Sequence, residues 1–281
     1  MRSSRAENAE VVRPSQMRAR TRPRQAQSRP RILLTNDDGI TSPGLLAAYA
    51  ELKRLGEVTV VAPDAERSAV GHAITTLTPL RVKEFIRGGR RIGYAIDGMP
   101  ADCVKLAITS LLAKRPDLVV SGINRGPNTG NNVIYSGTVS AATEARILGV
   151  PSMAVSLGTF TNPRWTGAAQ VTRRIAAAIL ERGLPKKVLL NVNVPNTEKH
   201  KIKGIRVTRM GDSGHVENFT IHTDRDNQPS YLLNAIYKVS DTDLDTDAAA
   251  LAAGWVTITP ITFDLTAHDV LEDITAWKLK L

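Results

Sequence analysis

Short apolar runs alternate with amphipathic segments through the first two thirds of the chain. Six runs rich in Val, Ile and Leu are typical of strands: 32–35, 58–62, 94–97, 118–122, 152–156 and 188–194. Four segments have the spacing of helices: 43–55, 100–114, 137–148 and 167–182. Several of the strand runs are apolar without interruption, as strands buried on both faces are. The alternation predicts a Rossmann-like α/β fold, with a mostly parallel sheet and helices on both faces.

The pattern changes after about residue 196. Shorter segments of alternating polarity follow, separated by polar turns, with an alanine-rich helix near 246–253. The segments are "GIRVTRMGDSG", "SYLLNAIYKVS" and "GWVTITPITFDLT". They are either antiparallel additions to the sheet or protruding hairpins, and such hairpins usually bind a partner subunit. We expect one domain over 31–281, with a core at 31–196 and a β-rich extension at 197–281.

Charge is concentrated at the start of the chain. Residues 1–30 hold eight arginines and two glutamates, which account for six of the ten net positive charges. This segment has few apolar residues, so we expect a disordered basic tail. The alternatives are a contact with nucleic acid or another polyanion, an organelle transit peptide, and a true start at Met17.

Cysteine content and hydropathy limit the class of protein. No apolar run reaches the roughly 18 to 20 residues that span a bilayer, so we expect no membrane partner. The single cysteine, Cys103, lies in an apolar helical pattern and leaves no disulfide within the chain. We therefore expect a core cysteine and a cytoplasmic protein.

Oxygen-bearing side chains follow three of the predicted strands. Asp37 and Asp38 come after the first strand, Ser68 after the second, and Asn124 after the fourth. Ligands of open parallel sheets bind beyond the carboxyl ends of the strands. Two carboxylates, a hydroxyl and an amide suit a hard divalent cation such as Mg²⁺, Mn²⁺ or Ca²⁺. Helix capping is the alternative for the aspartates, but Ser42 already occupies the expected N-cap.

A loop rich in glycine and asparagine precedes the third predicted helix. It runs through Asn128, and Ser136, Gly137 and Thr138 then open the helix. Hydroxyls and free amides at a helix start form an anion site, so these residues are candidates for binding an anion. An ordinary loop with Ser136 as N-cap is the alternative. The loop matches neither the P-loop nor the dinucleotide fingerprint.

Five segments in order resemble the SurE family, the survival-protein nucleotidases. They are "LLTNDDG", "RSAVGHAIT", "DGMPADCVKLA", "LVVSGINRGPNTGNNVIYSGTVSAATEA" and "NVNVP". The resemblance runs from about 31 to 266 and departs from the family pattern at Met99 and Trp255. It implies a divalent-metal-dependent phosphomonoesterase acting on nucleoside 5′- and 3′-monophosphates. It also implies homodimers or homotetramers joined through C-terminal extensions.

The same resemblance assigns roles to residues. The metal ligands of the family fall on the four residues selected above from strand ends, with one cation per subunit. Its phosphate-binding motif falls on Ser136, Gly137 and Thr138.

The resulting hypothesis is attack on phosphorus by a metal-activated water, with Asp37 as the catalytic residue. One rival is an aspartyl-phosphate enzyme, although such enzymes of the haloacid-dehalogenase type use aspartates one residue apart. The other rival is a nucleotide- or nucleic-acid-binding regulator that uses the basic tail. Deleting residues 1–30 separates an enzyme from such a regulator, because only the regulator should lose its function.

Overall fold

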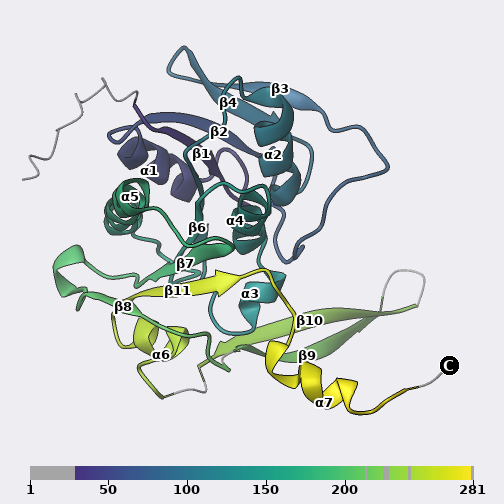
Figure 1. The fold of residues 1–281 in the computed structure, drawn as a ribbon. Coiled ribbons are helices and arrows are strands. Elements are labelled where there is room, and N and C mark those ends of the chain that lie inside the picture. Colours follow the sequence, from purple (N-terminus) through teal and green to yellow (C-terminus); the bar gives the residue numbers. More distant parts are fainter. Residues whose placement is uncertain (1–28, 213, 224–227, 240–241, 280–281) are drawn as a thin grey trace, which may run out of the picture.

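A nine-stranded sheet forms the centre of the computed structural model, which describes residues 29–212, 214–223, 228–239 and 242–279 (Figure 1). The strand order is β3-β4-β2-β1-β5-β6-β7-β11-β8. The strands are β1 (Arg31–Thr35), β2 (Glu57–Pro63), β3 (Val82–Arg87), β4 (Arg90–Ile96), β5 (Leu118–Arg125), β6 (Ser152–Leu157), β7 (Val188–Val194), β8 (Ile205–Val207) and β11 (Val256–Thr262). The predicted tail at 1–30 lies outside the described residues, except for its last two.

The six predicted strands form one continuous parallel block of this sheet, and β8 also pairs in parallel with β11. β4, β2, β1, β5, β6 and β7 pair in parallel, while β3 and β11 run antiparallel to β4 and β7. The prediction of a mostly parallel sheet is therefore confirmed. β3 was not predicted, because most of its side chains are exposed and it carries no buried apolar run.

Helices cover both faces of the sheet. The α-helices of the described residues are α1 (Pro43–Leu52), α2 (Pro100–Leu106), α3 (Asn132–Tyr135), α4 (Gly137–Ile147), α5 (Trp165–Arg182), α6 (Asp247–Ala252) and α7 (Leu271–Thr275). α1 and α5 pack together over one face, and α2 and α4 pack together over the other. The predicted helix at 100–114 is wrong at its end, since α2 continues only as a π-helical turn, Ala107–Leu111.

Neighbouring residues of each central strand serve opposite layers of the core. Leu34 and Val120 pack in the layer beneath α1 and α5, whereas Leu33 and Val119 pack in the layer beneath α2 and α4. Cys103 is fully buried in the second layer, which confirms its predicted packing role. Both faces need apolar side chains, and this explains the uninterrupted apolar runs in the sequence.

The C-terminal third contains both arrangements left open by the sequence. β11 and β8 extend the sheet, whereas β9 (Gly214–Thr223) and β10 (Pro229–Lys238) form a separate antiparallel hairpin. The hairpin projects from the α/β body (Figure 1). Within the described ranges, no helix has both the length and the apolar character that a membrane span requires.

Candidate active site

A crevice lies where the direction of the strand order reverses. The chain first builds β2 and β4 on one side of β1 and then crosses to β5 on the other side. Such reversals open a crevice at the carboxyl ends of the strands. Asp37 and Asp38 follow β1 there, Asn124 lies at the end of β5, and Ser68 lies on the loop after β2.

One cavity collects these side chains. Its volume is about 550 Å³, which lies within the roughly 300 to 1,000 Å³ of small-molecule sites. The predicted residues on its wall are Asp37, Asp38, Ser68, Asn124, Asn128 and Ser136. The structure therefore brings together all four predicted metal residues and two of the four predicted phosphate residues.

Asp37 is held from the start of α4. Its side chain is buried, and its Oδ1 accepts a hydrogen bond of 2.5 Å from the Thr138 hydroxyl. Burial raises the pKa of Asp37 to about 6, and the negative charge of Asp38 adds to this effect. The hydrogen bonds from the Thr138 side chain and backbone lower this pKa but do not offset burial.

The pKa of Asp38 is also raised above its ordinary value. Burial raises its pKa, although its Oδ2 accepts a 3.2 Å hydrogen bond from the backbone N–H of Arg125. Among the described residues, no salt bridge involves Asp37 or Asp38. The positive charge of Arg125 lowers the pKa of Asp38 but does not offset its burial, and a bound metal ion would add positive charge beside the two adjacent carboxylates.

Ser68 and Asn124 have their donor groups directed elsewhere. The Ser68 hydroxyl donates to Oε1 of Glu66 at 2.7 Å, and Nδ2 of Asn124 donates to the carbonyl of Gly126 at 2.9 Å. Each side chain keeps an oxygen with lone pairs. The set then consists of oxygen ligands, as a hard cation requires.

Within the described ranges, no group of three or more His, Cys, Asp or Glu residues could hold a metal ion. The candidate site differs in kind, because two carboxylates are supplemented by an amide and a hydroxyl. The residues present fit Mg²⁺ or Mn²⁺ better than a soft transition metal.

The predicted phosphate residues at the start of α4 lie in two positions. Ser136 is on the cavity wall, and its Oγ accepts from the N–H of Val139 at 3.1 Å, so it is also the N-cap. Gly137 and Thr138 are buried against Asp37 and do not line the cavity. In this structure the Thr138 hydroxyl therefore orients Asp37.

Asn128 is fixed to the ends of β6 and β7. Its N–H donates to Oδ1 of Asn193 at 2.9 Å, and its carbonyl accepts from Asn191 and Asn193. Its Nδ2 donates to Oγ of Ser156 at 2.8 Å. Asn128 thus lies on the cavity wall with its donor groups engaged by the sheet. The two asparagines of "NVNVP" are residues whose role sequence reasoning missed, and their signal was polar residues within an apolar strand.

Asp247 anchors the same loop from the C-terminal part of the chain. The side chain is fully buried and accepts from the N–H groups of Gly130, Gly211 and Ala248 at 3.0, 3.1 and 2.8 Å. Burial raises its pKa, while these hydrogen bonds lower it. Asp247 links the loop to the segment that enters β9, and sequence reasoning missed it because its partners are distant along the chain.

The loop that carries Ser68 is tied to α2 and α4. Nε2 of His72 lies 3.0 Å from Oε2 of the buried Glu144. Farther along the loop, the N–H and hydroxyl of Thr75 donate to Asp102 at 2.9 and 2.7 Å. These contacts hold the loop against the α/β core beside the cavity.

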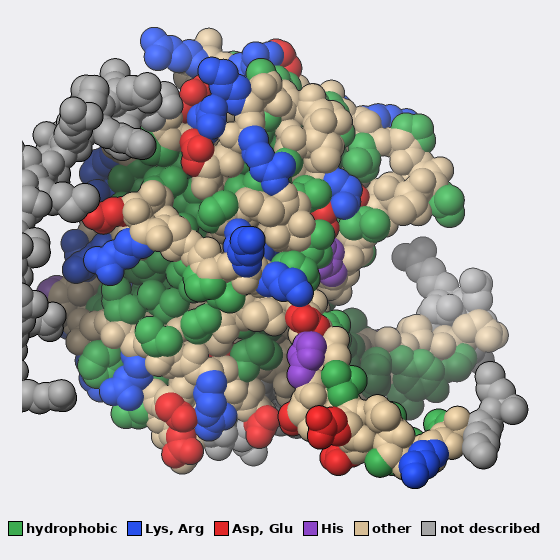
Figure 2. Space-filling view, in the orientation of Figure 1, with side chains coloured by type: hydrophobic (Ala, Val, Ile, Leu, Met, Phe, Trp, Pro, Cys, Tyr) green, Lys and Arg blue, Asp and Glu red, His purple; other side chains and the backbone are tan. Residues whose placement is uncertain are grey.

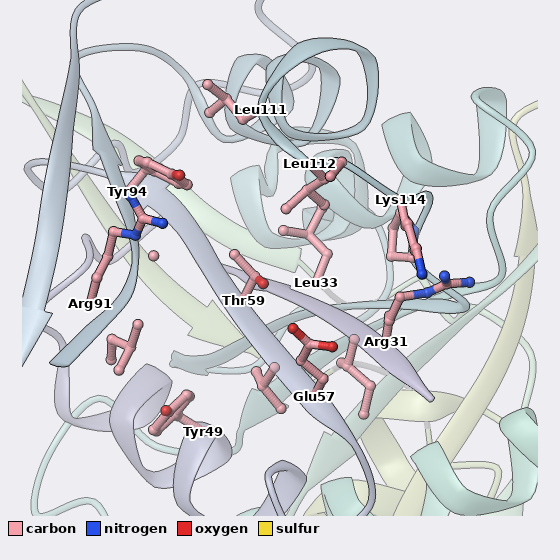
Figure 3. A pocket seen from close by; sticks show the side chains of 16 residues that line it. Arg31, Leu33, Tyr49, Glu57, Thr59, Arg91, Tyr94, Leu111, Leu112 and Lys114 are labelled. Carbon is pink, nitrogen blue, oxygen red and sulfur yellow. The ribbon is translucent and has the colours of Figure 1, made fainter. Parts of the chain in front are cut away.

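A second large cavity lies at the opposite end of the sheet. It measures about 670 Å³ and opens at the amino ends of β1 and β2. Arg91 and Tyr94 lie on one side of it, and Arg31 and Lys114 lie on the other (Figure 3). Two of its cations are already paired, Arg31 with Asp117 and Arg91 with Glu84. None of the predicted site residues lines it.

Comparisons with known proteins agree on one family. The family model described as "Survival protein SurE" matches residues 32–217. The "5'-nucleotidase SurE" of Syntrophobacter fumaroxidans is 47% identical over 249 residues, covering 89% of this chain and 100% of that protein. The protein of that name from Syntrophus aciditrophicus is 49% identical over 247 residues, covering 88% and 93%. The crystal structure of the SurE protein from Aquifex aeolicus superposes with a TM-score of 0.79 at 42% identity, covering 89% of this chain and 100% of that one.

Proposed function

The chain belongs to the survival protein SurE family, and we propose that it is a 5′-nucleotidase that releases phosphate from nucleoside monophosphates. The relatives described above carry that activity in their names and align over nearly their whole length. The observation that carries the proposal here is the single cavity that joins Asp37, Asp38, Ser68 and Asn124. Our proposal includes 3′-monophosphates as substrates and a divalent cation as cofactor.

The cation would be held by these four residues, one ion per subunit. Once bound, it would supply positive charge for the phosphate oxygens and lower the pKa of a water molecule that attacks phosphorus. The support is the donor set and the absence of a salt bridge to either aspartate among the described residues.

The surrounding residues have separate proposed tasks. Asp37 is the catalytic residue, since its carboxylate lines the cavity and Thr138 fixes its orientation. Ser136 and Gly137 begin α4, whose positive end favours an anion at this edge of the sheet. Asn128 shapes the cavity wall through its bonds to β6 and β7.

The testing experiment is hydrolysis of a panel of nucleoside 5′- and 3′-monophosphates by the purified chain. We expect activity to fall to background after chelation and dialysis, and to return when Mg²⁺ or Mn²⁺ is restored. Activity that survives exhaustive chelation contradicts the cofactor. Failure to hydrolyse any nucleotide with either metal contradicts the function itself.

The pH dependence of metal binding follows from Asp37. In the metal-free protein its pKa is raised from 3.8 to about 6, so below that pH a proton competes with the cation. Metal affinity should be highest above pH 7 and fall about ten-fold per unit below pH 6. Calorimetric titration with Mn²⁺ from pH 5 to 8 measures this, and a constant affinity across that range contradicts it. The raised pKa also means that ionised Asp37 destabilises the metal-free fold, a penalty absent below pH 3.8 and complete above about 6.

We further propose that the hairpin β9–β10 joins copies of the chain into a homodimer or homotetramer. Large apolar side chains are exposed along it: Phe219, Ile221, Tyr231, Leu232 and Leu233. Hydrophobic side chains gather along this arm in the space-filling view (Figure 2). Exposed apolar patches of this kind mark interaction surfaces. Light scattering on the purified chain should give at least twice the monomer mass, and a monomer contradicts the proposal.

Two predictions about partners and location rest on the sequence. A nucleic-acid contact through residues 1–30 lies outside the described residues, and on the described face Lys and Arg are scattered among acids rather than gathered (Figure 2). The proposed cytoplasmic location rests on the single cysteine.

A further inference from the structure

Two exposed aromatic side chains lie at the rim of the active-site cavity. Phe160, on the loop after β6, is 55% exposed, and Tyr135, at the end of α3, is 63% exposed. Both line the same cavity as Asp37. Phe160 and Pro127 also line a neighbouring cavity of about 630 Å³, so the Phe160 ring stands between the two. Large exposed aromatics beside a polar site suit a flat apolar ligand group.

Two kinds of side chain line the active-site cavity. The charged and polar ones include Asp37, Asp38, Glu66, Ser68, Asn124 and Arg125, and the apolar and aromatic ones include Pro127, Tyr135, Phe160 and Leu233. A nucleoside monophosphate has groups that suit both kinds, since its phosphate is charged and its base presents flat apolar faces.

We propose that Phe160 is the platform on which the nucleobase of the substrate stacks. This inference rests on the proposed nucleotidase function and adds the residue that lets the site distinguish a nucleotide from a smaller phosphate ester. Stacking on an aromatic ring tolerates any base, because every base has a π face. The chemistry therefore fits a site for nucleoside monophosphates in general, with little discrimination between bases.

The position of the ring is fixed by the backbone that also carries Asn124. Gly126 has a φ of +112°, and a methyl group at its Cα would overlap the Phe160 ring. The ring thus lies directly on Gly126, whose N–H donates to the carbonyl of Leu157 at 3.1 Å. The carbonyl of Gly126 accepts from Nδ2 of Asn124. The platform and a proposed metal ligand are therefore tied to the same residue, which fixes their separation.

Two substrates separate base stacking from phosphate binding. The probes are adenosine 5′-monophosphate and ribose 5-phosphate, which lacks the base, each assayed with Mn²⁺. In Phe160→Ala we expect KM for the nucleotide to rise about ten-fold, the low end of measured base–aromatic stacking, while KM for ribose 5-phosphate stays unchanged. Phe160→Trp should keep the nucleotide KM near the wild-type value, since it retains a π face.

Matched controls keep the test decisive. Thr161→Ala alters the next residue of the same loop, which lines neither cavity, and should leave both KM values unchanged. Phe160→Leu removes the ring face but keeps apolar bulk, so it gives the same comparison if the alanine variant does not fold. Equal changes for both substrates, or no change for the nucleotide, overturn the platform. A wild-type enzyme that hydrolyses neither substrate overturns the proposed function instead.

Discussion

Replacing Asp37 with asparagine should lower kcat/KM for a nucleoside 5′-monophosphate by more than about 100-fold while leaving the chain folded. Loss of a group that merely supports a metal ligand costs roughly 10- to 100-fold, and a ligand itself should cost more. Asparagine keeps the shape of the side chain and can still accept the hydrogen bond from the Thr138 hydroxyl. It removes the negative charge that would hold a cation. The measurements are steady-state kinetics and calorimetric titration with Mn²⁺.

The stability of the metal-free Asp37→Asn variant should not fall. The pKa of Asp37 is raised to about 6, so at pH 7.5 the ionised carboxylate is disfavoured in the folded state. A neutral amide removes that penalty at this pH, and thermal unfolding without metal should give an equal or higher Tm. This outcome separates loss of chemistry from loss of fold.

Asp117→Asn is the matched control. Asp117 lies at the amino end of the sheet, where it accepts from the N–H and guanidinium of Arg31. It should reduce stability slightly and leave turnover near normal. Near-normal turnover in Asp37→Asn would refute the assignment, and a phosphoryl group trapped on Asp37 would favour the aspartyl-phosphate mechanism over attack by water.

The parallel part of the fold was predictable because a strand buried on both faces has an almost uninterrupted apolar sequence. Runs such as "ILLT" and "LVVSG" are apolar at every position or nearly so, and each corresponds to a central strand. β3, "VKEFIR", lacks that mark, because an edge strand with exposed side chains satisfies its backbone through β4 alone. The helices α3 and α7, with four and five residues, are too short to leave a helical period in the sequence.

The candidate metal residues were predictable for a topological reason. The residues that hold the neighbouring loops in place were not. In a parallel sheet the residues after each strand meet at one edge, so local position along the chain was enough to find Asp37, Ser68 and Asn124. Asp247 reaches Gly130 across 117 residues of sequence. No local pattern encodes such a contact.

The role of Thr138 shows the limit of reading a helix start as an anion site. The motif placed its hydroxyl on phosphate, yet in the structure the hydroxyl donates to Asp37. The preceding residue, Gly137, has no side-chain carbon, and this lets the start of α4 approach Asp37 closely.

Gly137→Ala should therefore lower kcat/KM about 100-fold, even though Gly137 does not line the cavity. A methyl group on Gly137 would lie 2.8 Å from Cβ of Asp37, 3.1 Å from its Oδ2 and 3.2 Å from Cγ of Pro100. Because real Cβ atoms do not approach this closely, Asp37 or the start of α4 has to shift. Displacement of a reacting group by about 1 Å can cost roughly 100-fold in rate. Steady-state kinetics and Mn²⁺ affinity measure the effect, and both should fall.

Gly167→Ala in α5 is the control that isolates geometry from helix propensity. A methyl group there meets no atom within 4 Å, so alanine should stabilise the helix by about 0.5 to 1 kcal/mol without changing turnover. Gly137→Ala receives part of the same propensity benefit, which offsets some of its clash and keeps the fold intact. If both variants retained full activity, the close approach of α4 to Asp37 would have no catalytic role. If only Gly137→Ala loses activity, and its Tm stays similar, then Gly137 is required to keep Asp37 in its active position.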